Sequence, residues 1–323
     1  MREDGRGLDR RGFLRGAATG AALTAMPLAA APALAHGGHG EDHRRGHSIP
    51  RENISIQLYT LRDQMAADTQ GTLNALARIG YRAVEHAGFV GHTATEFKAM
   101  LRNAGLRATS GHQGVPQPYD AAAWQAQIRD AVTIGQRYIV NPASPITFFP
   151  TDGDLSKIRG LPTAAAWRAY AADLNKAGAA ARQAGLRLGF HNHFWEWAPL
   201  EDDTPLTGFD ILIAETDPRL VHFEVDLYWA WFAHRDPVGL LAQVGDRIRQ
   251  FHVKDMRFVN HVPTWADPGT GVIDFARIFA AAGSPREHQY IVERDDAGTG
   301  DREPEDALDT AAVGYRFLRN IRF

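Results

Sequence analysis

The sequence predicts a (β/α)8 barrel, also called a TIM barrel, in a single domain. From residue 53 onward, short apolar runs alternate with amphipathic segments, a pattern that indicates parallel strands joined by helices. There are eight such runs in about 270 residues, which matches the strand count and the usual length of this barrel. The main structural alternative is an open doubly wound sheet. It is disfavoured because TLRDQM, without a glycine-rich phosphate loop, follows the first run.

The eight predicted strands are five to seven residues long, and each ends in or next to a polar residue. They are ISIQLY (54–59), YRAVEH (81–86), LRATSGH (106–112), YIVNP (138–142), LRLGFH (186–191), LVHFEVD (220–226), IRQFHVK (248–254) and QYIVE (289–293). In a barrel, the carboxyl ends of all strands meet at one rim, and catalytic residues lie there or in the loops that follow. The polar strand ends therefore predict an active site at this rim.

The segments between the strands have helical periodicity, and the first four end on the glycine that is common just past a helix C-terminus. These four are TQGTLNALARIG (69–80), TATEFKAMLRNAG (93–105), AAAWQAQIRDAVTIG (121–135) and TAAAWRAYAADLNKAGAAARQAG (163–185). The series continues with LTGFDILIAE (206–215), DPVGLLAQVG (236–245), VIDFARIFAAAG (272–283) and EDALDTAAVGYRFLRN (305–320).

The N-terminal part of the chain does not fit the barrel pattern. Residues 1–35 carry the pair Arg10-Arg11, an alanine-rich apolar run and an Ala-x-Ala sequence at 33–35, which together predict a twin-arginine signal peptide. The run is too weakly apolar for a membrane span, which needs about 20 strongly apolar residues. Residues 36–52 form a His- and Gly-rich linker, and 53–323 form the barrel domain. We therefore expect a periplasmic or extracellular protein, which N-terminal sequencing of the mature chain would test.

Composition narrows the function classes. The chain has no cysteine, so disulfides and thiolate metal ligands are impossible. The formal charge of −3 becomes −5 once the signal is removed, with 30 basic and 35 acidic residues left. This acidic balance argues against nucleic acid as a partner. No segment after the signal is apolar enough to span a membrane. The composition is compatible with a homo-oligomer. A small-molecule substrate is the expected partner.

Four strand ends in the C-terminal half carry side chains of the kinds that bind metals. They are His191, Asp226, His252 and Glu293. Any one of them alone is more often a hydrogen-bonded polar residue, but four on consecutive strands predict one divalent metal ion. Mixed nitrogen and oxygen ligands favour Mn²⁺ or Zn²⁺, with Co²⁺ and Fe²⁺ as alternatives. Whether His191 or His193 is the ligand is open, since both face one side of an extended strand.

Other residues at this rim are candidates for catalysis and substrate binding. Lys254 would lie on the same face as His252 and could stabilise a negative substrate oxygen, or form a salt bridge to Asp255 or another neighbour. His112 is a candidate acid or base. Aromatic faces stack on sugars, so Trp229 is a candidate pocket residue, although core packing is the alternative. The predicted substrate-binding residues are Tyr59, His86, Asn141, His193 and Trp229.

These motifs together resemble the xylose isomerase-like barrel superfamily, often called sugar phosphate isomerase/epimerase-like proteins. The motifs that carry the resemblance are SIQLYTLRD, VEHAGF, TSGHQG, LGFHNHFWEW, VDLYWAW, FHVKD, GTGVIDF and IVERD, spread over residues 54–295. The resemblance implies a divalent metal held by residues of strands five to eight, where relatives carry Glu, Asp, His and Glu. Asp226, His252 and Glu293 match the last three, whereas His191 stands where many relatives carry glutamate.

The resemblance implies proton abstraction next to a sugar carbonyl, with Glu293 as the base and Lys254 stabilising the enediolate. Isomerisation or elimination needs only one strong base, so the histidine at 191 disfavours an epimerisation that uses two carboxylates. The expected export favours a non-phosphorylated sugar or keto-sugar. A lyase or hydrolase that cleaves 3-keto-glycosides is the alternative in the same site. A non-catalytic sugar-binding protein is the alternative of another class.

Overall fold

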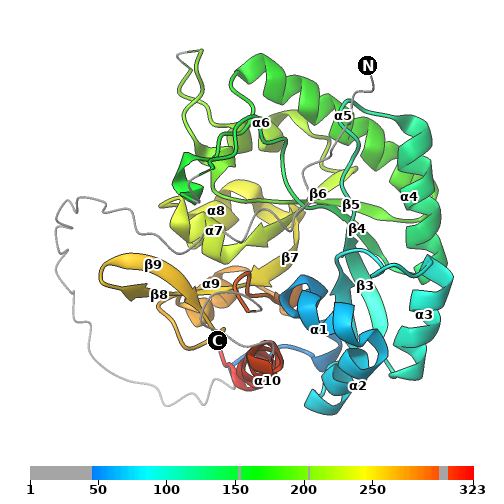
Figure 1. The fold of residues 1–323 in the computed structure, drawn as a ribbon. Helices are drawn as coiled ribbons and strands as arrows, with labels where there is room; N and C mark the ends of the chain where they lie inside the picture. Colours follow the sequence, from blue (N-terminus) through cyan, green and yellow to red (C-terminus); the bar gives the residue numbers. More distant parts are fainter. Residues whose placement is uncertain (1–45, 152–153, 203, 298–304) are drawn as a thin grey trace.

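A computed structural model of the chain describes residues 46–151, 154–202, 204–297 and 305–323 (Figure 1). The predicted signal peptide and residues 36–45 of the predicted linker lie outside the described residues, so the export signal stays a prediction. Residues 46–52 lie on the barrel. The backbones of His47 and Phe323 exchange two hydrogen bonds, of 2.7 and 3.2 Å, and Ile49 is buried.

Eight parallel strands form a nearly closed barrel, which confirms the predicted fold class. The order around the sheet is β1-β10-β7-β6-β5-β4-β3-β2, and a parallel bridge between Gln57 and Glu85 brings the two edges together. Each strand lies within a run predicted from the sequence. The strands are β1 (Ile54–Ile56), β2 (Ala83–His86), β3 (Arg107–His112), β4 (Tyr138–Asn141), β5 (Arg187–His191), β6 (Val221–Asp226), β7 (Ile248–Val253) and β10 (Gln289–Val292).

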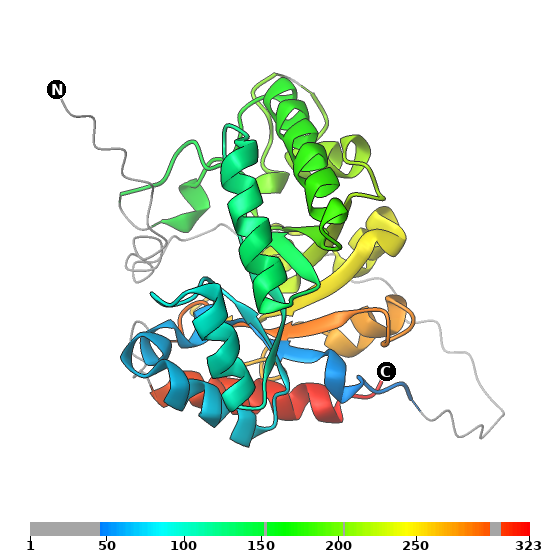
Figure 2. The same cartoon turned by 90° about the vertical axis from the view of Figure 1, so that its right-hand side faces the viewer.

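Helices surround the strands, as the two views in Figures 1 and 2 show. They are α1 (Arg62–Ala67), α2 (Thr69–Ile79), α3 (Ala94–Asn103), α4 (Ala121–Ile134), α5 (Ala164–Gln183), α6 (Gly208–Glu215), α7 (Leu227–Phe232), α8 (Pro237–Val244), α9 (Phe275–Ala281) and α10 (Glu305–Asn320). Thr93 and Glu96 form a capping box at the start of α3, and Gly135 ends α4 in the left-handed conformation, with φ of 87°. Within the described residues, no helix has the length and apolarity needed to cross a bilayer.

Two features near the carboxyl rim depart from the sequence prediction. An antiparallel hairpin, β8 (Asp255–Val259) and β9 (Val262–Ala266), follows β7 and forms its own sheet, at the left in Figure 1. The aromatic segment after Asp226 is the short helix α7, because the Asp226 carboxylate accepts a hydrogen bond from the backbone N–H of Trp229 at 2.9 Å. Trp265 of the hairpin stacks on Tyr228 of α7, with ring centroids 5.7 Å apart. The hairpin therefore packs against the segment that follows the sixth barrel strand.

Candidate metal centre and active site

The interior of this barrel is lined with polar side chains near the carboxyl ends of its strands. Barrels of this class usually fill their interior with bulky branched side chains. Here the fully buried polar side chains on strands or strand ends include Gln57, Glu85, Glu224, Gln250 and His252. The Gln57 amide donates to Glu85 Oε1 at 2.8 Å, directly across the closing seam. Because burying unpaired polar groups costs free energy, a connected polar interior at this depth indicates a functional site.

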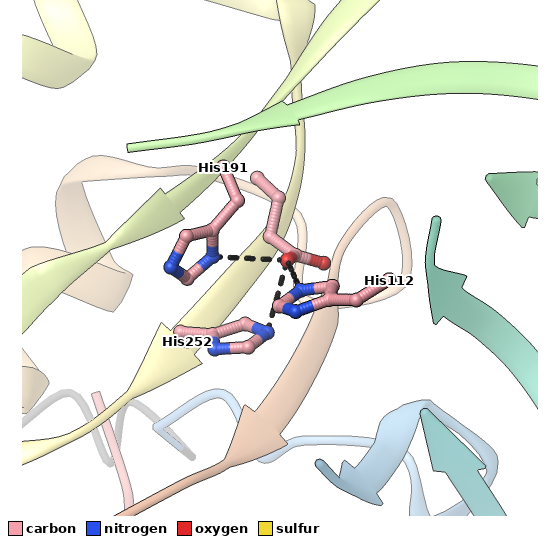
Figure 3. A group of neighbouring side chains, drawn as sticks. His112, His191 and His252 are labelled. Carbon is pink, nitrogen blue, oxygen red and sulfur yellow. Dashed lines mark hydrogen bonds and ion pairs between the residues drawn. The ribbon is translucent and has the colours of Figure 1, made fainter. Parts of the chain in front are cut away.

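Three histidines surround one oxygen of Glu224. Figure 3 labels the three rings and marks these contacts with dashed lines. Glu224 Oε1 lies 2.9 Å from His112 Nε2, 3.1 Å from His191 Nδ1 and 2.9 Å from His252 Nε2. Glu85 Oε1 also lies 2.8 Å from His252 Nε2 and 3.1 Å from His112 Nε2. We call His112, His191, Glu224 and His252 the inner group; their potential ligand atoms all lie within 4.8 Å of one another.

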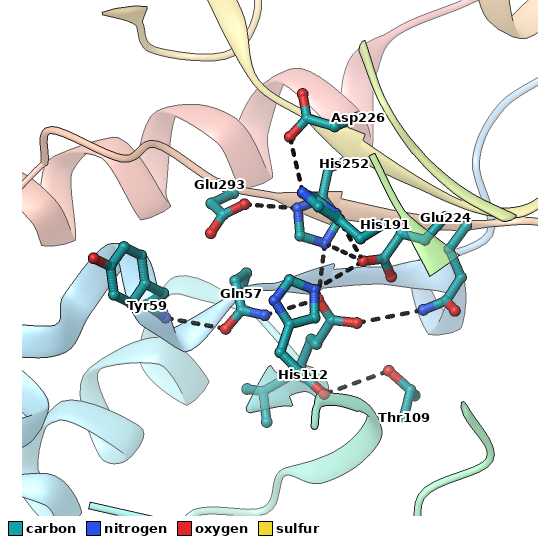
Figure 4. A network of polar contacts seen from close by, with 12 residues as sticks. Gln57, Tyr59, Thr109, His112, His191, Glu224, Asp226, His252 and Glu293 are labelled. Atoms are coloured by element: carbon teal, nitrogen blue, oxygen red, sulfur yellow. Dashed lines mark hydrogen bonds and ion pairs between the residues drawn. The ribbon is translucent and has the colours of Figure 1, made fainter. Parts of the chain in front are cut away.

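A second group lies at the carboxyl rim and shares His252 with the first (Figure 4). Asp226, His252 and Glu293, called here the outer group, also have potential ligand atoms within 4.8 Å of one another. His252 Nδ1 lies 2.7 Å from Glu293 Oε2. His191 approaches this group through Nε2, which lies 3.6 Å from Asp226 Oδ2. The structure thus brings together the four residues predicted as metal ligands, with His191 and His252 between the two groups.

The directions of the hydrogen bonds distinguish the inner group from the outer group. A carboxylate oxygen only accepts, so the ring nitrogens that face Glu224 carry protons: Nδ1 of His191 and Nε2 of His252. In His191, whose ring is neutral, the opposite nitrogen then presents a lone pair to Asp226, whereas His252, which the surrounding carboxylates keep protonated, donates through Nδ1 to Glu293. The lone pair of His191 Nε2 and the Asp226 carboxylate, 3.6 Å apart, repel each other unless a cation or a proton lies between them. The outer group, extended by His191, therefore fits a divalent ion, with nitrogen and oxygen ligands that suit Zn²⁺ or Mn²⁺.

Lys254 provides a fixed positive charge beside the outer group. Its Nζ lies 2.9 Å from Asp226 Oδ2, 2.9 Å from Glu293 Oε2 and 3.1 Å from Asp295. Lys254 does not pair with Asp255, the neighbour considered from the sequence. The Asp255 carboxylate instead accepts backbone N–H groups at the base of the hairpin, including that of Gly271 at 2.8 Å. The ammonium therefore lies where it can act on a group bound next to Glu293.

In this cluster, burial and neighbouring charges shift the pKa values of Lys254, His252 and Glu293 in opposite directions. Burial lowers the pKa of Lys254 and of His252, but the surrounding carboxylates outweigh it and hold both pKa values well above the usual ones. Burial raises the pKa of Glu293, but Lys254 and His252 outweigh it and hold that pKa well below its usual range. Burial, reinforced by the neighbouring His252, lowers the pKa of His191 well below 6.5, so this ring is neutral. Glu293 is thus charged and His191 has a free lone pair.

Two predicted substrate-binding residues are not brought to the cluster. His86 is fully buried, donates to Gln136 Oε1 at 2.7 Å and packs on Phe89, with ring centroids 4.8 Å apart. Burial lowers its pKa to about 4. Asn141 accepts from the backbone N–H of Val115 at 2.7 Å and donates to the backbone carbonyl oxygen of Ala143 and to the Tyr170 hydroxyl. These contacts hold helices and loops on the barrel.

The other three predicted substrate-binding residues lie at or behind the rim. His193 stacks on Trp195 at a centroid distance of 4.3 Å and lies 5.0 Å from the His191 ring. Trp229 is fully buried, behind Lys254, whose Nζ lies 5.6 Å from its ring centroid. Tyr59 is partly exposed, with its ring directed away from the histidines and under the Arg62 guanidinium (Figure 4). Of these three, His193 has its ring beside the predicted ligand His191, and Trp229 contacts the predicted ligand Asp226 through its backbone N–H.

Sequence reasoning missed Glu85 and Glu224 as members of the site. Side chains alternate along a strand, so Glu224 faces the same way as Asp226, two residues later. The same alternation makes Glu85 and His86 face opposite ways, and the structure turns Glu85 inward. The alternation of side chains could therefore have identified Glu224 from the sequence. No local feature of the sequence shows which of Glu85 and His86 faces the barrel interior.

Glu196 is a further buried carboxyl, in the loop after β5. Its Oε1 accepts from the Ser144 hydroxyl at 2.8 Å, and its Oε2 accepts from the backbone N–H of His193 at 2.8 Å. Burial raises the pKa of Glu196 from 4.5 to about 7, although these hydrogen bonds oppose the shift. Glu196 therefore ties the segment that carries His193 to the loop after β4.

This raised pKa predicts a pH dependence of stability. Between about pH 4.5 and 7 the folded protein keeps a proton on Glu196 that the unfolded chain has lost, so stability falls as pH rises through this window. A shift of this size corresponds to about 3 kcal/mol. We expect Glu196→Gln to remove this contribution, so that the variant gains stability relative to the unsubstituted protein between pH 4.5 and 8. Urea unfolding across this range measures the difference, and parallel profiles would contradict the assignment.

Comparison with known proteins agrees with this architecture. A family model described as "Xylose isomerase-like TIM barrel" matches residues 73–321. Among curated proteins, an inosose dehydratase of Geobacillus kaustophilus is 25% identical over 64% of this chain and 73% of its own length. Matches to other inosose dehydratases cover less, for example 41% of the protein from Clostridium beijerinckii, at 28% identity.

Solved structures share the fold. A sugar phosphate isomerase/epimerase from Parabacteroides distasonis superposes with a TM-score of 0.66 at 23% identity, over 84% of this chain and 94% of that one. The IolI protein, whose structure contains a bound zinc atom, superposes with a TM-score of 0.60 at 12% identity, over 84% and 99% of the two chains. At these identities the likeness concerns the fold alone.

Proposed function

Because this chain belongs to the xylose isomerase-like TIM barrel family, we propose that it removes a proton next to the carbonyl of a non-phosphorylated sugar or keto-sugar, with the help of one divalent metal ion. The chain is an enzyme, as are its curated relatives. The observation that carries the proposal is the outer group, whose potential ligand atoms lie within 4.8 Å of one another, together with the neutral His191, which directs Nε2 toward Asp226 at 3.6 Å. A divalent cation bound here would take the Nε2 lone pair of His191 and compensate the charge of the Asp226 and Glu293 carboxylates.

The residues that would hold the ion are His191, Asp226, His252 and Glu293. Their donor set supports Mn²⁺ or Zn²⁺ first, and Co²⁺ or Fe²⁺ as alternatives. A zinc atom in the related IolI fold is consistent with this choice. When bound, the ion would polarise the substrate carbonyl and make the neighbouring C–H bond more acidic.

The chain's own groups then divide the proton transfer between them. Glu293 Oε2 is engaged by His252 and Lys254, which leaves Oε1 to take the proton from the substrate carbon. The electron pair of the broken C–H bond moves toward the carbonyl oxygen. The Lys254 ammonium stabilises the negative charge that develops on this oxygen. His112, partly buried and with a pKa that Glu85 and Glu224 raise against the effect of desolvation, is the candidate acid that returns a proton.

Two outcomes are open to the substrate after the C–H bond breaks. Reprotonation at the neighbouring carbon gives isomerisation, whereas loss of a substituent from the next carbon gives elimination. Elimination, as in a lyase that acts on 3-keto-glycosides, is the second candidate. His191 at the fifth-strand position disfavours an epimerisation that uses two carboxylates, and a single base, Glu293, is compatible with isomerisation and with elimination. A curated relative named as a dehydratase favours elimination.

Metal content and product analysis test this proposal. We expect the purified protein to contain about one divalent ion per chain, to lose activity with a chelator and to regain it with Mn²⁺ or Zn²⁺. Incubation in D₂O with free ketoses and with 3-keto-glycosides separates the two reactions: deuterium incorporation with aldose–ketose exchange indicates isomerisation, and release of the aglycone indicates cleavage. A protein that neither binds nor needs a divalent ion would refute the proposal.

A further inference from the structure

We infer that Glu224 is a positioning residue, which accepts ring N–H groups of the histidines and thereby keeps the proton of neutral His191 on Nδ1, so that Nε2, the nitrogen facing Asp226, keeps its lone pair. The inference deepens the proposed function, since the nitrogen that faces Asp226 is the one available to a metal ion. It concerns a residue beneath the predicted ligands, which need not touch either metal or substrate.

The position of Glu224 follows from the register of the sheet. Glu224 pairs with His191 across β5 and β6, and Asp226 pairs with His252 across β6 and β7. Glu224 therefore lies one layer deeper than Asp226 and directly beside His191. Its side chain is fully buried, so water does not compete for its oxygens. No other described residue accepts a hydrogen bond from His191 Nδ1, which depends on Glu224 for its acceptor.

Only one of the two Glu224 oxygens accepts hydrogen bonds from the histidine rings. Oε1 meets all three imidazoles, whereas Oε2 has no hydrogen-bond partner among the described residues. Oε1 can therefore accept whether or not Oε2 carries a proton. It follows that glutamine, which keeps an oxygen at this position, should preserve the arrangement, and that methionine, which fills similar space without an acceptor, should abolish it.

Glu85 shares the role of hydrogen-bond acceptor with Glu224 for His252 but not for His191. Its Oε1 accepts from His252 Nε2 at 2.8 Å, so His252 has two carboxylate acceptors on its inner side. His191 has only Glu224 on its inner side and Asp226 Oδ2, 3.6 Å from Nε2, on its outer side. Without the Glu224 acceptor, the His191 proton should therefore move to Nε2, where it blocks the nitrogen that faces Asp226. Glu224→Met is expected to affect His191 more than His252.

Histidine ¹⁵N–¹H correlation spectra of the metal-free protein test the inference directly. In the unsubstituted chain we expect neutral His191 to carry its proton on Nδ1, with its signals identified by their loss in His191→Gln. In Glu224→Met the proton should move to Nε2, and in Glu224→Gln it should stay on Nδ1. A His191 proton on Nε2 in the unsubstituted chain would overturn the inference, and this measurement stands even where Glu224→Met does not fold.

Metal affinity, measured by calorimetry with Zn²⁺ or Mn²⁺ alone, gives a second readout. Loss of a group that orients a ligating histidine typically weakens metal binding 10- to 100-fold. We expect this loss in Glu224→Met, near-normal affinity in Glu224→Gln, and unchanged affinity in Glu196→Gln, whose buried carboxyl accepts from the Ser144 hydroxyl and from the backbone N–H of His193. Normal affinity in Glu224→Met would overturn the inference, as would complete loss in Glu224→Gln, which would make Glu224 a ligand. If the unsubstituted chain binds neither ion but shows the Nδ1–H form, the metal proposal fails and the role of Glu224 is supported.

Discussion

Glu293→Gln is expected to lower kcat/KM about 10³-fold or more while the fold is retained. The amide fills the same volume and can still accept a hydrogen bond from Lys254, but it cannot take up a proton from the substrate carbon. Removal of a general base typically costs 10²- to 10⁴-fold, and weaker metal binding adds to the loss. Steady-state kinetics on whichever substrate class is active measure the effect, with circular dichroism as the check on folding.

The matched control is Glu287→Gln, an exposed glutamate six residues earlier in the chain. It makes the same chemical change before β10 and should leave turnover unaltered. Near-normal turnover in Glu293→Gln, with the metal still bound, would refute the assignment of Glu293 as the base. The proton would then have to go to a histidine, of which His112 is the candidate.

Lys254→Met is expected to destabilise the folded protein by about 3–5 kcal/mol, because removal of one partner leaves the other buried charges uncompensated. Lys254 is 1% exposed and contacts Asp226, Glu293 and Asp295, all of them buried. Chemical denaturation in the presence of a chelator measures the loss without compensation by a bound cation. Lys176→Met is the control, since Lys176 is exposed and forms an ion pair with Asp173 on the surface of α5.

The loss in Lys254→Met should depend on pH in a defined direction. Burial raises the pKa of Asp295 to about 6 even against the charge of Lys254. Without the ammonium, this pKa rises further, and the folded variant binds protons that the unfolded chain has released. Its deficit should therefore be larger at pH 8 than at pH 5. A deficit below 1 kcal/mol at pH 8 would show that Lys254 is not the counter-charge of this cluster.

The strand predictions succeeded because each barrel strand has a local signal. Apolar runs of five to seven residues, bounded by turn residues and followed by helical periodicity, gave all eight strands. The β8–β9 hairpin was missed because its turn, Asn260-His261, places His261 at a φ of 65° without the glycine that usually marks such turns. The helix α7 was missed because its aromatic residues fit a strand as well as a helix, and its start depends on the Asp226 cap.

The candidate site was predictable where it depends on strand ends. Asp226, His252, Lys254 and Glu293 come together because the carboxyl ends of consecutive parallel strands meet at one rim. His86 and Asn141 also lie at the ends of predicted strands. Their side chains, however, bind Gln136 and the loops around Tyr170, respectively. Position at a strand end does not by itself say which way a side chain points.

The sequence alone determined the barrel, the order of its strands and the identity of the residues at its carboxyl rim, because these depend on local periodicity and on the geometry of parallel strands. Only the tertiary structure decided that Glu85 and Glu224 face inward, and that His191 turns Nδ1 to Glu224 and Nε2 to Asp226. Both depend on the register between strands that are neighbours in space. A ring nitrogen acquires its role from the groups on its two sides, and those groups come from different strands.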